Sequence, residues 1–200
     1  LISESAWEEM TCLFAPSLEN RLNTGSADKL IAEPGLSLFI EDEHDSILFD
    51  TGPDGSFIHN AALMGIHLTN LTAAILSHGH YDHCGGVPWL PRNCRIVCHP
   101  LIHSERYSAF TFFRYSAKIK KLSLDIDCAH NHMEYSSTPI NLGERFMWSG
   151  EIPVSNSNAY GIIGGNNGGM DYVQDEGALI YKSDRDLAPP FPGNAANLLI

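Results

Sequence analysis

The sequence has few basic residues and no long apolar run. Its 200 residues contain 12 Lys and Arg against 24 Asp and Glu, which gives a formal net charge of −12. This excess of negative charge disfavours binding to nucleic acid or to an acidic membrane surface. No run reaches the roughly 18 apolar residues that a membrane-spanning helix needs. We therefore expect no nucleic-acid partner and no membrane partner, and we expect the ligand to be a small-molecule substrate.

Disulfide frameworks and common nucleophile motifs are also missing. The five cysteines make an odd count without regular spacing, which predicts reduced thiols in a cytoplasmic protein. No Gly-x-Ser-x-Gly elbow marks a serine hydrolase. The glycine-rich stretch at residues 161–169 lacks the lysine and the hydroxyl residue of a phosphate-binding P-loop. We predict that this stretch is a flexible loop.

The apolar fraction of 44% is large enough for one buried core, so residues 1–200 are predicted to form a single domain. Apolar and polar patterning predicts strands and short helices in alternation, which indicates an α/β (α+β) architecture. The strands are expected at residues 36–41, 46–50, 73–76, 95–98, 146–148 and 178–181. The helical segments are expected at residues 57–64, 87–90 and 100–107.

The densest polar cluster directly follows one of these apolar strands. Residues 77–86 read Ser-His-Gly-His-Tyr-Asp-His-Cys-Gly-Gly and place His78, His80, Asp82 and His83 within six positions. Extended residues two apart point the same way, so His78 and His80 can meet one ion. Asp82 and His83 are adjacent and can serve a second ion. Imidazole and carboxylate ligands suit zinc, iron and manganese, so we predict one or two divalent metal ions here, with zinc favoured.

The string from His78 to Gly86 resembles the His-x-His-x-Asp-His signature of the metallo-β-lactamase-fold superfamily. Upstream, Phe49-Asp50-Thr51-Gly52 is similar to the first motif of that superfamily, a strand ending in Asp-Thr-Gly. Segments at 35–41, 98–100, 149–153 and 174–179 are similar to a branch of metal-dependent hydrolases that includes the dihydropterin-aminobenzene phosphate synthase-like proteins. The resemblance covers about residues 30–182.

The resemblance implies a four-layer αβ/βα sandwich with the metals at one edge of its two sheets. It implies that His78 and His80 bind the first ion and that Asp82 and His83 bind the second. Asp82 is also our candidate catalytic residue, as a base or proton shuttle near the bound water. Asp50 is implied to orient the ligand loop, as carboxylates behind metal ligands do.

The last part of the chain departs from this pattern. The resembled branch continues from the segment at 174–179 into a strand and a Thr-Gly-Cys-x-His-like ligand loop, whereas no histidine follows His132 here. We therefore expect the second half of the fold to be incomplete, truncated or altered after about residue 182, without its late ligands. The candidates for replacing those ligands are His99, His103, His130, His132, Asp171 and Asp175.

Three further features have two interpretations each. The Cys and His residues at 94–103 have a loose zinc-site spacing, whereas a buried cysteine such as Cys98 is more often part of the core. Cys84 is either a nucleophile or a small residue that packs beneath the ligand loop. The lysines at 118–121 form either a solvated face or, near the metals, a site that helps to hold a phosphate.

Two hypotheses about function follow. The first is a metal-dependent hydrolase that uses a metal-activated water on an ester, a phosphoester or a related small-molecule bond. The resemblance also admits chemistry on a phosphorylated pterin-type substrate. The second is a non-catalytic fragment or degenerate homologue with weak or no metal binding, which the missing late ligands favour.

Overall fold

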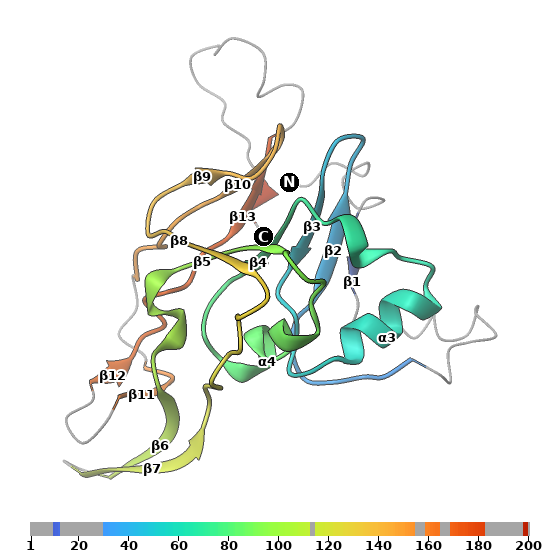
Figure 1. The fold of residues 1–200 in the computed structure, drawn as a ribbon. Helices are drawn as coiled ribbons and strands as arrows, with labels where there is room; N and C mark the ends of the chain where they lie inside the picture. The colour runs from blue at the N-terminus through green and yellow to red at the C-terminus, as the bar shows by residue number, and fades with distance from the viewer. Residues whose placement is uncertain are drawn as a thin grey trace.

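A six-stranded mixed sheet lies at the centre of the protein (Figure 1). The structure is a computed structural model that describes residues 10–12, 30–112, 115–154, 159–164, 169–182 and 198–199. The sheet has the order β1 (Met10–Cys12), β2 (Leu38–Glu41), β3 (Ser46–Phe49), β4 (Ala73–Leu76), β5 (Arg95–Cys98) and β8 (His132–Tyr135). Strands β1 to β3 pair antiparallel, and strands β3, β4, β5 and β8 pair in parallel. The parallel strands bring their carboxyl ends to one edge.

Helices cover one face of this sheet. The helical elements are α3 (Ser56–Leu63), η2 (Leu68–Asn70), α4 (Tyr81–Cys84), η3 (Val87–Trp89) and η4 (Pro100–His103). Each contributes a buried residue to one apolar cluster, which also contains Ala74 and Leu76 of β4. Ala73 and Ile75 of the same strand belong to a second cluster on the other face. Successive strand residues point to opposite faces, so β4 is an uninterrupted apolar run because both faces are buried.

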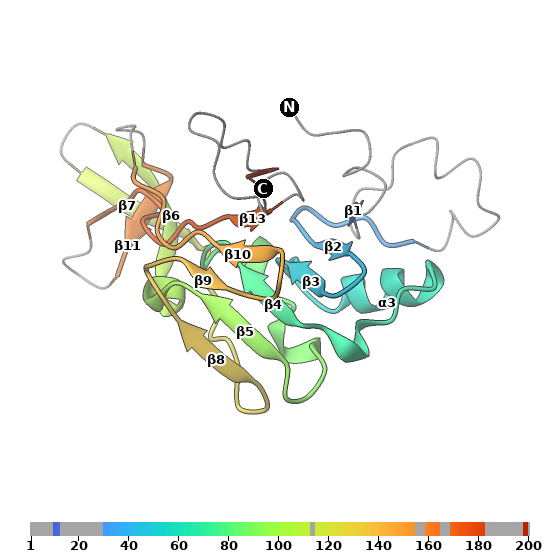
Figure 2. The same ribbon diagram turned by 90° about the horizontal axis from the view of Figure 1, so that it is seen from above.

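A four-stranded antiparallel sheet covers the second face (Figure 2). Its order is β14 (Leu198–Leu199), β13 (Leu179–Tyr181), β10 (Phe146–Trp148) and β9 (Ile140–Asn141). Trp148 and Leu179 are fully buried and pack in the second cluster with Ile47 and Ile75. The described residues therefore form a helical layer and two facing sheets.

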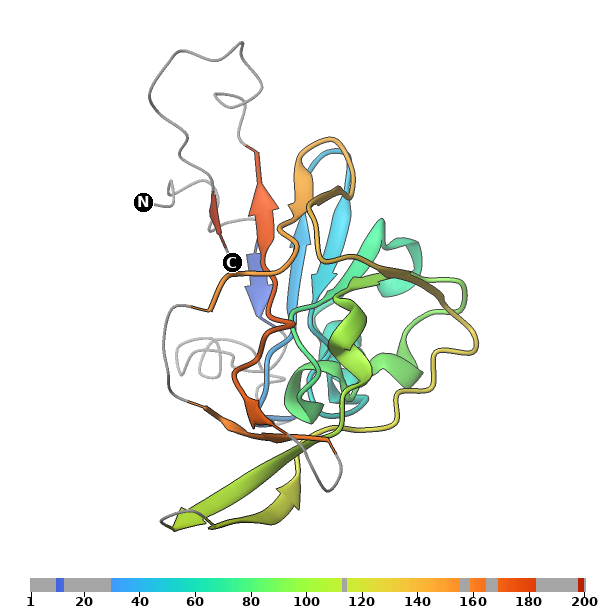
Figure 3. The same ribbon diagram turned by 90° about the vertical axis from the view of Figure 1, so that its left-hand side faces the viewer.

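A third sheet lies at one end of the molecule (Figure 3). It has the order β12 (Met170–Asp171), β11 (Gly161–Ile163), β6 (Arg106–Phe112) and β7 (Tyr115–Lys121). Strands β6 and β7 form a long hairpin with an irregularity between Ser108 and Ala109. Both β12 and the first residue of β6 lie next to the ligand loop, as described below.

The predicted α/β class is confirmed, and strands were correctly expected at 73–76 and 95–98. Two expectations were wrong. The helix expected over 100–107 ends at His103, and the chain is extended from Arg106. Residues 161–163, expected to be a loop, form β11 because Ile162 pairs with Tyr107 of β6. In both cases long-range strand pairing determined the local conformation.

Two other expectations concern the chain as a whole. None of the helices in the described part of the chain has both the length and the apolarity to cross a bilayer. Residues 183–197 lie outside the described residues, so an altered second half of the fold stays a prediction.

Candidate metal centre

The four predicted metal ligands lie in one segment after the carboxyl end of β4, here called the ligand loop (residues 77–86), with His78 and His80 before α4 and Asp82 and His83 within α4. Backbone hydrogen bonds fix this loop from both sides. The Tyr81 N–H donates to the Leu122 carbonyl at 2.7 Å, and the Thr51 N–H donates to the His83 carbonyl at 2.8 Å. An ideal Cβ on Gly79 would overlap the carbonyl oxygen of Ile102. The loop therefore approaches the segment after β5 as closely as only glycine permits.

The structure brings the three imidazoles of the loop together. The ring centroids of His78 and His83 are 4.1 Å apart, and those of His78 and His80 are 4.7 Å apart. An Asp82 carboxylate oxygen lies 3.9 Å from His83 Nε2, and the Asp82 side chain is about one third exposed. The four residues thus form one cluster at the edge of the sheet where the sequence placed them.

Asp50 anchors the loop from the first half of the fold. Its side chain is fully buried directly after β3. One carboxylate oxygen accepts from the Ser77 N–H at 2.7 Å, and the other accepts from the Ser77 hydroxyl at 2.7 Å and lies 2.8 Å from His83 Nδ1. The backbone of Asp50 has a φ of 60°, which non-glycine residues rarely adopt. These contacts agree with the orienting role that the resemblance implied for Asp50.

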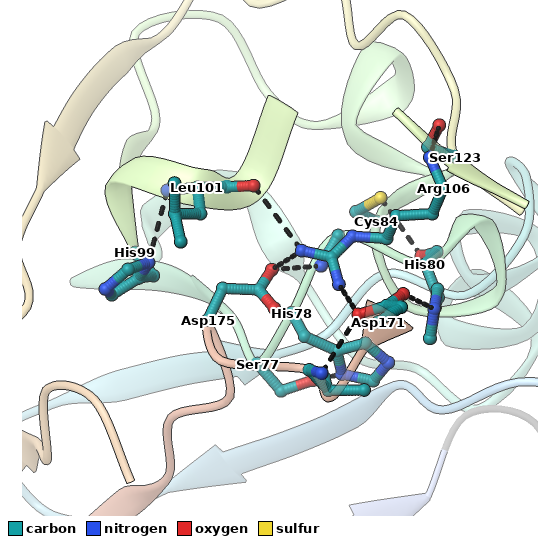
Figure 4. A network of polar contacts seen from close by, with 12 residues as sticks. Ser77, His78, His80, Cys84, His99, Leu101, Arg106, Ser123, Asp171 and Asp175 are labelled. Atoms are coloured by element: carbon teal, nitrogen blue, oxygen red, sulfur yellow. Dashed lines mark hydrogen bonds and ion pairs between the residues drawn. The ribbon is translucent and has the colours of Figure 1, made fainter. Parts of the chain in front are cut away.

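A second anchor comes from residues far along the chain (Figure 4). Asp171 Oδ2 lies 3.1 Å from His80 Nε2, and Asp175 Oδ2 accepts from the Gly79 N–H at 2.8 Å. The buried guanidinium of Arg106 joins the two carboxylates, at 2.9 Å from Asp171 and 2.7 Å from Asp175. The sequence suggested both aspartates as replacement metal ligands, and the structure places them against Arg106 and the loop. Arg106 itself was missed, because no local pattern marks it.

Burial and charge shift the pKa values of His78 and His83. Burial, together with the neighbouring His83, His80 and Arg106, lowers the pKa of His78 to about 2. His78 is therefore neutral, which is the form that binds a metal. Burial also lowers the pKa of His83, but the hydrogen bond and negative charge of Asp50 outweigh burial and leave this pKa raised. The field that favours a cationic ring there also favours a metal cation nearby.

The donor set fits a divalent ion in its chemistry. His78 contacts the Ser77 hydroxyl through Nδ1, and His83 contacts Asp50 through Nδ1. The Nε2 atom of each ring is therefore left to bind a metal ion. His80 is held at Nε2 and so offers Nδ1. Within the described ranges, however, no group of three or more His, Cys, Asp or Glu side chains has the geometry to hold a metal ion. Metal ligation by His78, His80, Asp82 and His83 therefore stays a prediction.

The alternative zinc spacing at residues 94–103 has other partners in the structure. His99 caps the N-terminus of η4, where its Nδ1 accepts from the Leu101 N–H at 3.1 Å. His103 Nε2 lies 2.8 Å from the Tyr135 hydroxyl. Cys94 and Cys98 are buried in the first apolar cluster. These contacts favour core packing over a second metal site. His130 and His132 are exposed.

Cys84 also has a structural role. It is fully buried, and its thiol donates to the His80 carbonyl at 3.1 Å. Burial raises the pKa of this thiol, so a reactive thiolate is disfavoured. Cys84 therefore packs in the first apolar cluster at the end of α4, and it is a free cysteine, as are Cys94, Cys98 and Cys128.

One lysine of the basic patch reaches the ligand loop. Lys120 Nζ lies 3.2 Å from the Tyr81 hydroxyl and 4.6 Å from the centre of the Tyr81 ring. Lys118 instead lies over Tyr107, and Lys121 pairs with acidic side chains. Among these three exposed lysines, Lys120 is the one placed beside the predicted ligands.

Comparison with known proteins identifies relatives for most of the chain. The sequence profile of the metallo-beta-lactamase superfamily matches residues 30–153. A 7,8-dihydropterin-6-methyl-4-(beta-D-ribofuranosyl)-aminobenzene-5'-phosphate synthase of Methanocaldococcus jannaschii is 28% identical in an alignment of 174 positions that covers 78% of this chain and 59% of that protein. An uncharacterized protein of the same organism is 25% identical in an alignment of 129 positions that covers 62% of this chain and 49% of that protein.

A solved structure shows the same fold. A metal-dependent hydrolase of the beta-lactamase superfamily matches with a TM-score of 0.68 and 22% sequence identity, over 88% of this chain and 61% of that chain. This chain spans 49% and 59% of the lengths of the two curated relatives. Because the superfamily profile covers residues 30–153, which are more than half of the sequence, this chain belongs to the metallo-β-lactamase superfamily.

Proposed function

We propose that this protein is a metal-dependent hydrolase that acts on an ester, a phosphoester or a related bond of a small molecule. Membership of the superfamily supports the reaction class. The observation that carries the proposal is the cluster of three imidazoles, in which the ring centroid of His78 lies 4.1 Å from that of His83 and 4.7 Å from that of His80. Asp82 lies beside His83. A bound divalent ion would supply an activated water near neutral pH and would polarise the scissile bond.

The residues of the ligand loop divide the work between binding and proton transfer. His78, His80 and His83 would hold the metal as neutral imidazoles, with one or two divalent ions, zinc favoured. Asp82 would contribute its carboxylate and accept or deliver a proton. Its side chain is about one third exposed, so substrate and water can reach the carboxylate.

Two anchors would keep these donors in place. Asp50 holds His83 at Nδ1 and Ser77 at its backbone and hydroxyl groups. Hydrogen bonds from carboxylates to metal-binding histidines orient the rings and raise their basicity. The loop would therefore be organised before the metal binds, which lowers the cost of ordering it on binding.

An anionic substrate is favoured at this site. Lys120 is exposed, and its ammonium group contacts Tyr81, which lies between two predicted ligands. A phosphate or carboxylate on the substrate would gain a charge-assisted hydrogen bond there. The relative named as an aminobenzene-5'-phosphate synthase supports a phosphorylated substrate class.

A second candidate function is a non-catalytic homologue that binds metal weakly or not at all. It is favoured by the lack, within the described residues, of a group of three donors with metal-binding geometry. Metal content separates the two candidates directly.

The test measures bound metal and hydrolysis together. Protein purified without chelator is assayed by elemental analysis, and the metal-free protein is titrated with zinc, iron(II) and manganese(II). Hydrolysis is followed with p-nitrophenyl acetate and bis(p-nitrophenyl) phosphate. We expect one or two metal ions per chain and hydrolysis that depends on them. We expect His80→Ala to lose both the bound metal and the hydrolysis, because it removes one of the predicted metal ligands.

His67→Ala is the matched control. His67 is exposed and precedes β4, at the end of the strand opposite to the ligand loop. It should keep the metal content and the activity of the parent protein. A folded parent protein that binds none of the three metals would refute the proposal and support the non-catalytic alternative. Unchanged metal content in His80→Ala would refute the assignment of His80.

A further inference from the structure

An ion cluster of three fully buried side chains lies behind the ligand loop. Arg106 is 1% exposed, and Asp171 and Asp175 are 0% exposed. One guanidinium thus neutralises part of two carboxylates that come from the segment around β12. Burying three charges is costly unless each is well paired. Their placement therefore calls for a role beyond that of filling the core.

The two carboxylates of the cluster contact two adjacent residues of the ligand loop. Asp171 contacts the His80 ring at Nε2, and Asp175 accepts from the Gly79 N–H. A third contact, from the Gly177 N–H to the Ser77 carbonyl at 3.0 Å, joins the same segments. The ring and the backbone of the ligand loop are thus held from one rigid, charged unit.

Both carboxylate oxygens of Asp171 are already engaged by protein groups. Its Oδ1 accepts from Arg106 Nη1 at 2.9 Å and from the Val173 N–H at 2.9 Å, and its Oδ2 faces His80. The adjacent guanidinium also repels a cation. Asp171 is therefore suited to orienting a metal ligand and poorly suited to being one.

We propose that Asp171, held in place by Arg106 and accompanied by Asp175, is a positioning residue that keeps His80 in the Nε2–H tautomer and so presents Nδ1 to the metal. This inference rests on the proposed function, because it assigns the late aspartates to that same site. It gives the two late aspartates a role behind the ligands.

Replacing Asp171 by Asn makes the tautomer itself the readout. Two donors, Arg106 Nη1 and the Val173 N–H, face the Oδ1 position. They will draw the amide oxygen of the asparagine toward themselves, which leaves its NH2 group facing His80. His80 Nε2 must then accept, and the proton moves to Nδ1. The wrong histidine tautomer is a known way for Asp→Asn replacement to disable a site while leaving its geometry intact.

The experiment combines long-range ¹H–¹⁵N spectra of the histidine rings with zinc binding measured by competition with a chromophoric chelator, on the full chain. We expect His80 of the parent protein to be the Nε2–H tautomer and to keep its Nε2–H signal after zinc is added. Asp171→Asn should convert it to the Nδ1–H tautomer and weaken zinc binding by about 10- to 100-fold. The control Glu134→Gln, which alters an exposed pair with Arg95, should change neither quantity.

Each outcome has a defined meaning. An Nδ1–H tautomer in the parent protein, or loss of the Nε2–H signal when zinc binds, overturns the proposal. An unchanged tautomer in folded Asp171→Asn overturns it as well. If Asp171→Asn does not fold, the two measurements on the parent protein still decide. If the parent protein binds no zinc yet shows the expected tautomers, the proposed function fails and the positioning contact stands.

Discussion

Arg106→Met should destabilise the protein far more than the loss of an ordinary ion pair. Arg106 is 1% exposed and forms ion pairs of 2.9 and 2.7 Å with two carboxylates that are fully buried. Removing one partner of a buried pair costs about 3–5 kcal/mol, because the remaining charge is left without compensation. Here the carboxylates of Asp171 and Asp175 would both lose the guanidinium. Each would keep one backbone hydrogen bond, from the Val173 N–H and the Gly79 N–H respectively, which offsets part of the cost. We therefore expect a loss of about 3–5 kcal/mol in the free energy of unfolding.

Urea denaturation of the metal-free protein, followed by circular dichroism, measures this loss. With a slope of about 2–3 kcal/mol per M urea, the midpoint should fall by about 1–2.5 M. Arg95→Met is the matched control, since its 2.8 Å pair with Glu134 has side chains that are 34% and 42% exposed. Such a pair contributes about 0–1 kcal/mol. Adding Asp175→Asn to Arg106→Met should recover part of the stability by removing one uncompensated charge.

Equal midpoints for Arg106→Met and Arg95→Met would refute this reasoning. That result would mean that the two aspartates are neutral or solvated in the folded protein, so that Arg106 compensates no charge. A further loss on adding Asp175→Asn would contradict it in a different way. It would show that the hydrogen bonds of that carboxylate outweigh the cost of its charge.

Three other predictions concern the surroundings of the site. Gly79→Ala should destabilise the protein by about 1–3 kcal/mol and lower its zinc content, because the new Cβ would overlap the Ile102 carbonyl oxygen. The control Gly169→Ala adds a Cβ in open space, so it should change neither thermal unfolding nor zinc content. Lys120→Ala should raise KM for a phosphorylated ester several-fold and leave KM for an uncharged ester unchanged, and equal effects on both would exclude an anion-binding role. In native protein at pH 8, iodoacetamide should modify the partly exposed Cys128 before the buried Cys84, Cys94 and Cys98, as mass spectrometry of the peptides would show. Equally fast modification of these four cysteines would contradict the view that burial disfavours the thiolate form.

The sequence was informative where the relevant signals are local. The apolar run at 73–76 and the four ligand-type residues that follow it predicted a buried strand and a polar cluster at its end, and both are observed. Asp50 was also expected to orient the loop, on the basis of family resemblance. These features depend on neighbours within a few positions or on short motifs, so one segment at a time is enough to identify them.

The second anchor could not be predicted in this way. Arg106 contacts Asp171 across 65 positions, and Asp171 contacts His80 across 91. Neither Arg106 nor Asp171 has a local pattern that indicates burial. The same cause explains the wrong helix over 100–107, because Arg106 begins a strand that pairs with the distant β11. Pairing of distant segments overrides the local preference of a short stretch.

Both sheets that flank the loop contribute to the organisation of the predicted metal centre. Asp50 reaches His83 from the end of β3, whereas Asp171 reaches His80 from β12 in a different sheet. Because the two rings are held by side chains from two different sheets, neither half of the chain alone orients both of them. The ligand loop therefore acquires its geometry only after β12 has docked against β6 through β11, so any metal site formed there depends on tertiary structure and not on the His-x-His-x-Asp-His motif by itself. For this reason variants of Asp171 test the site as directly as variants of the histidines.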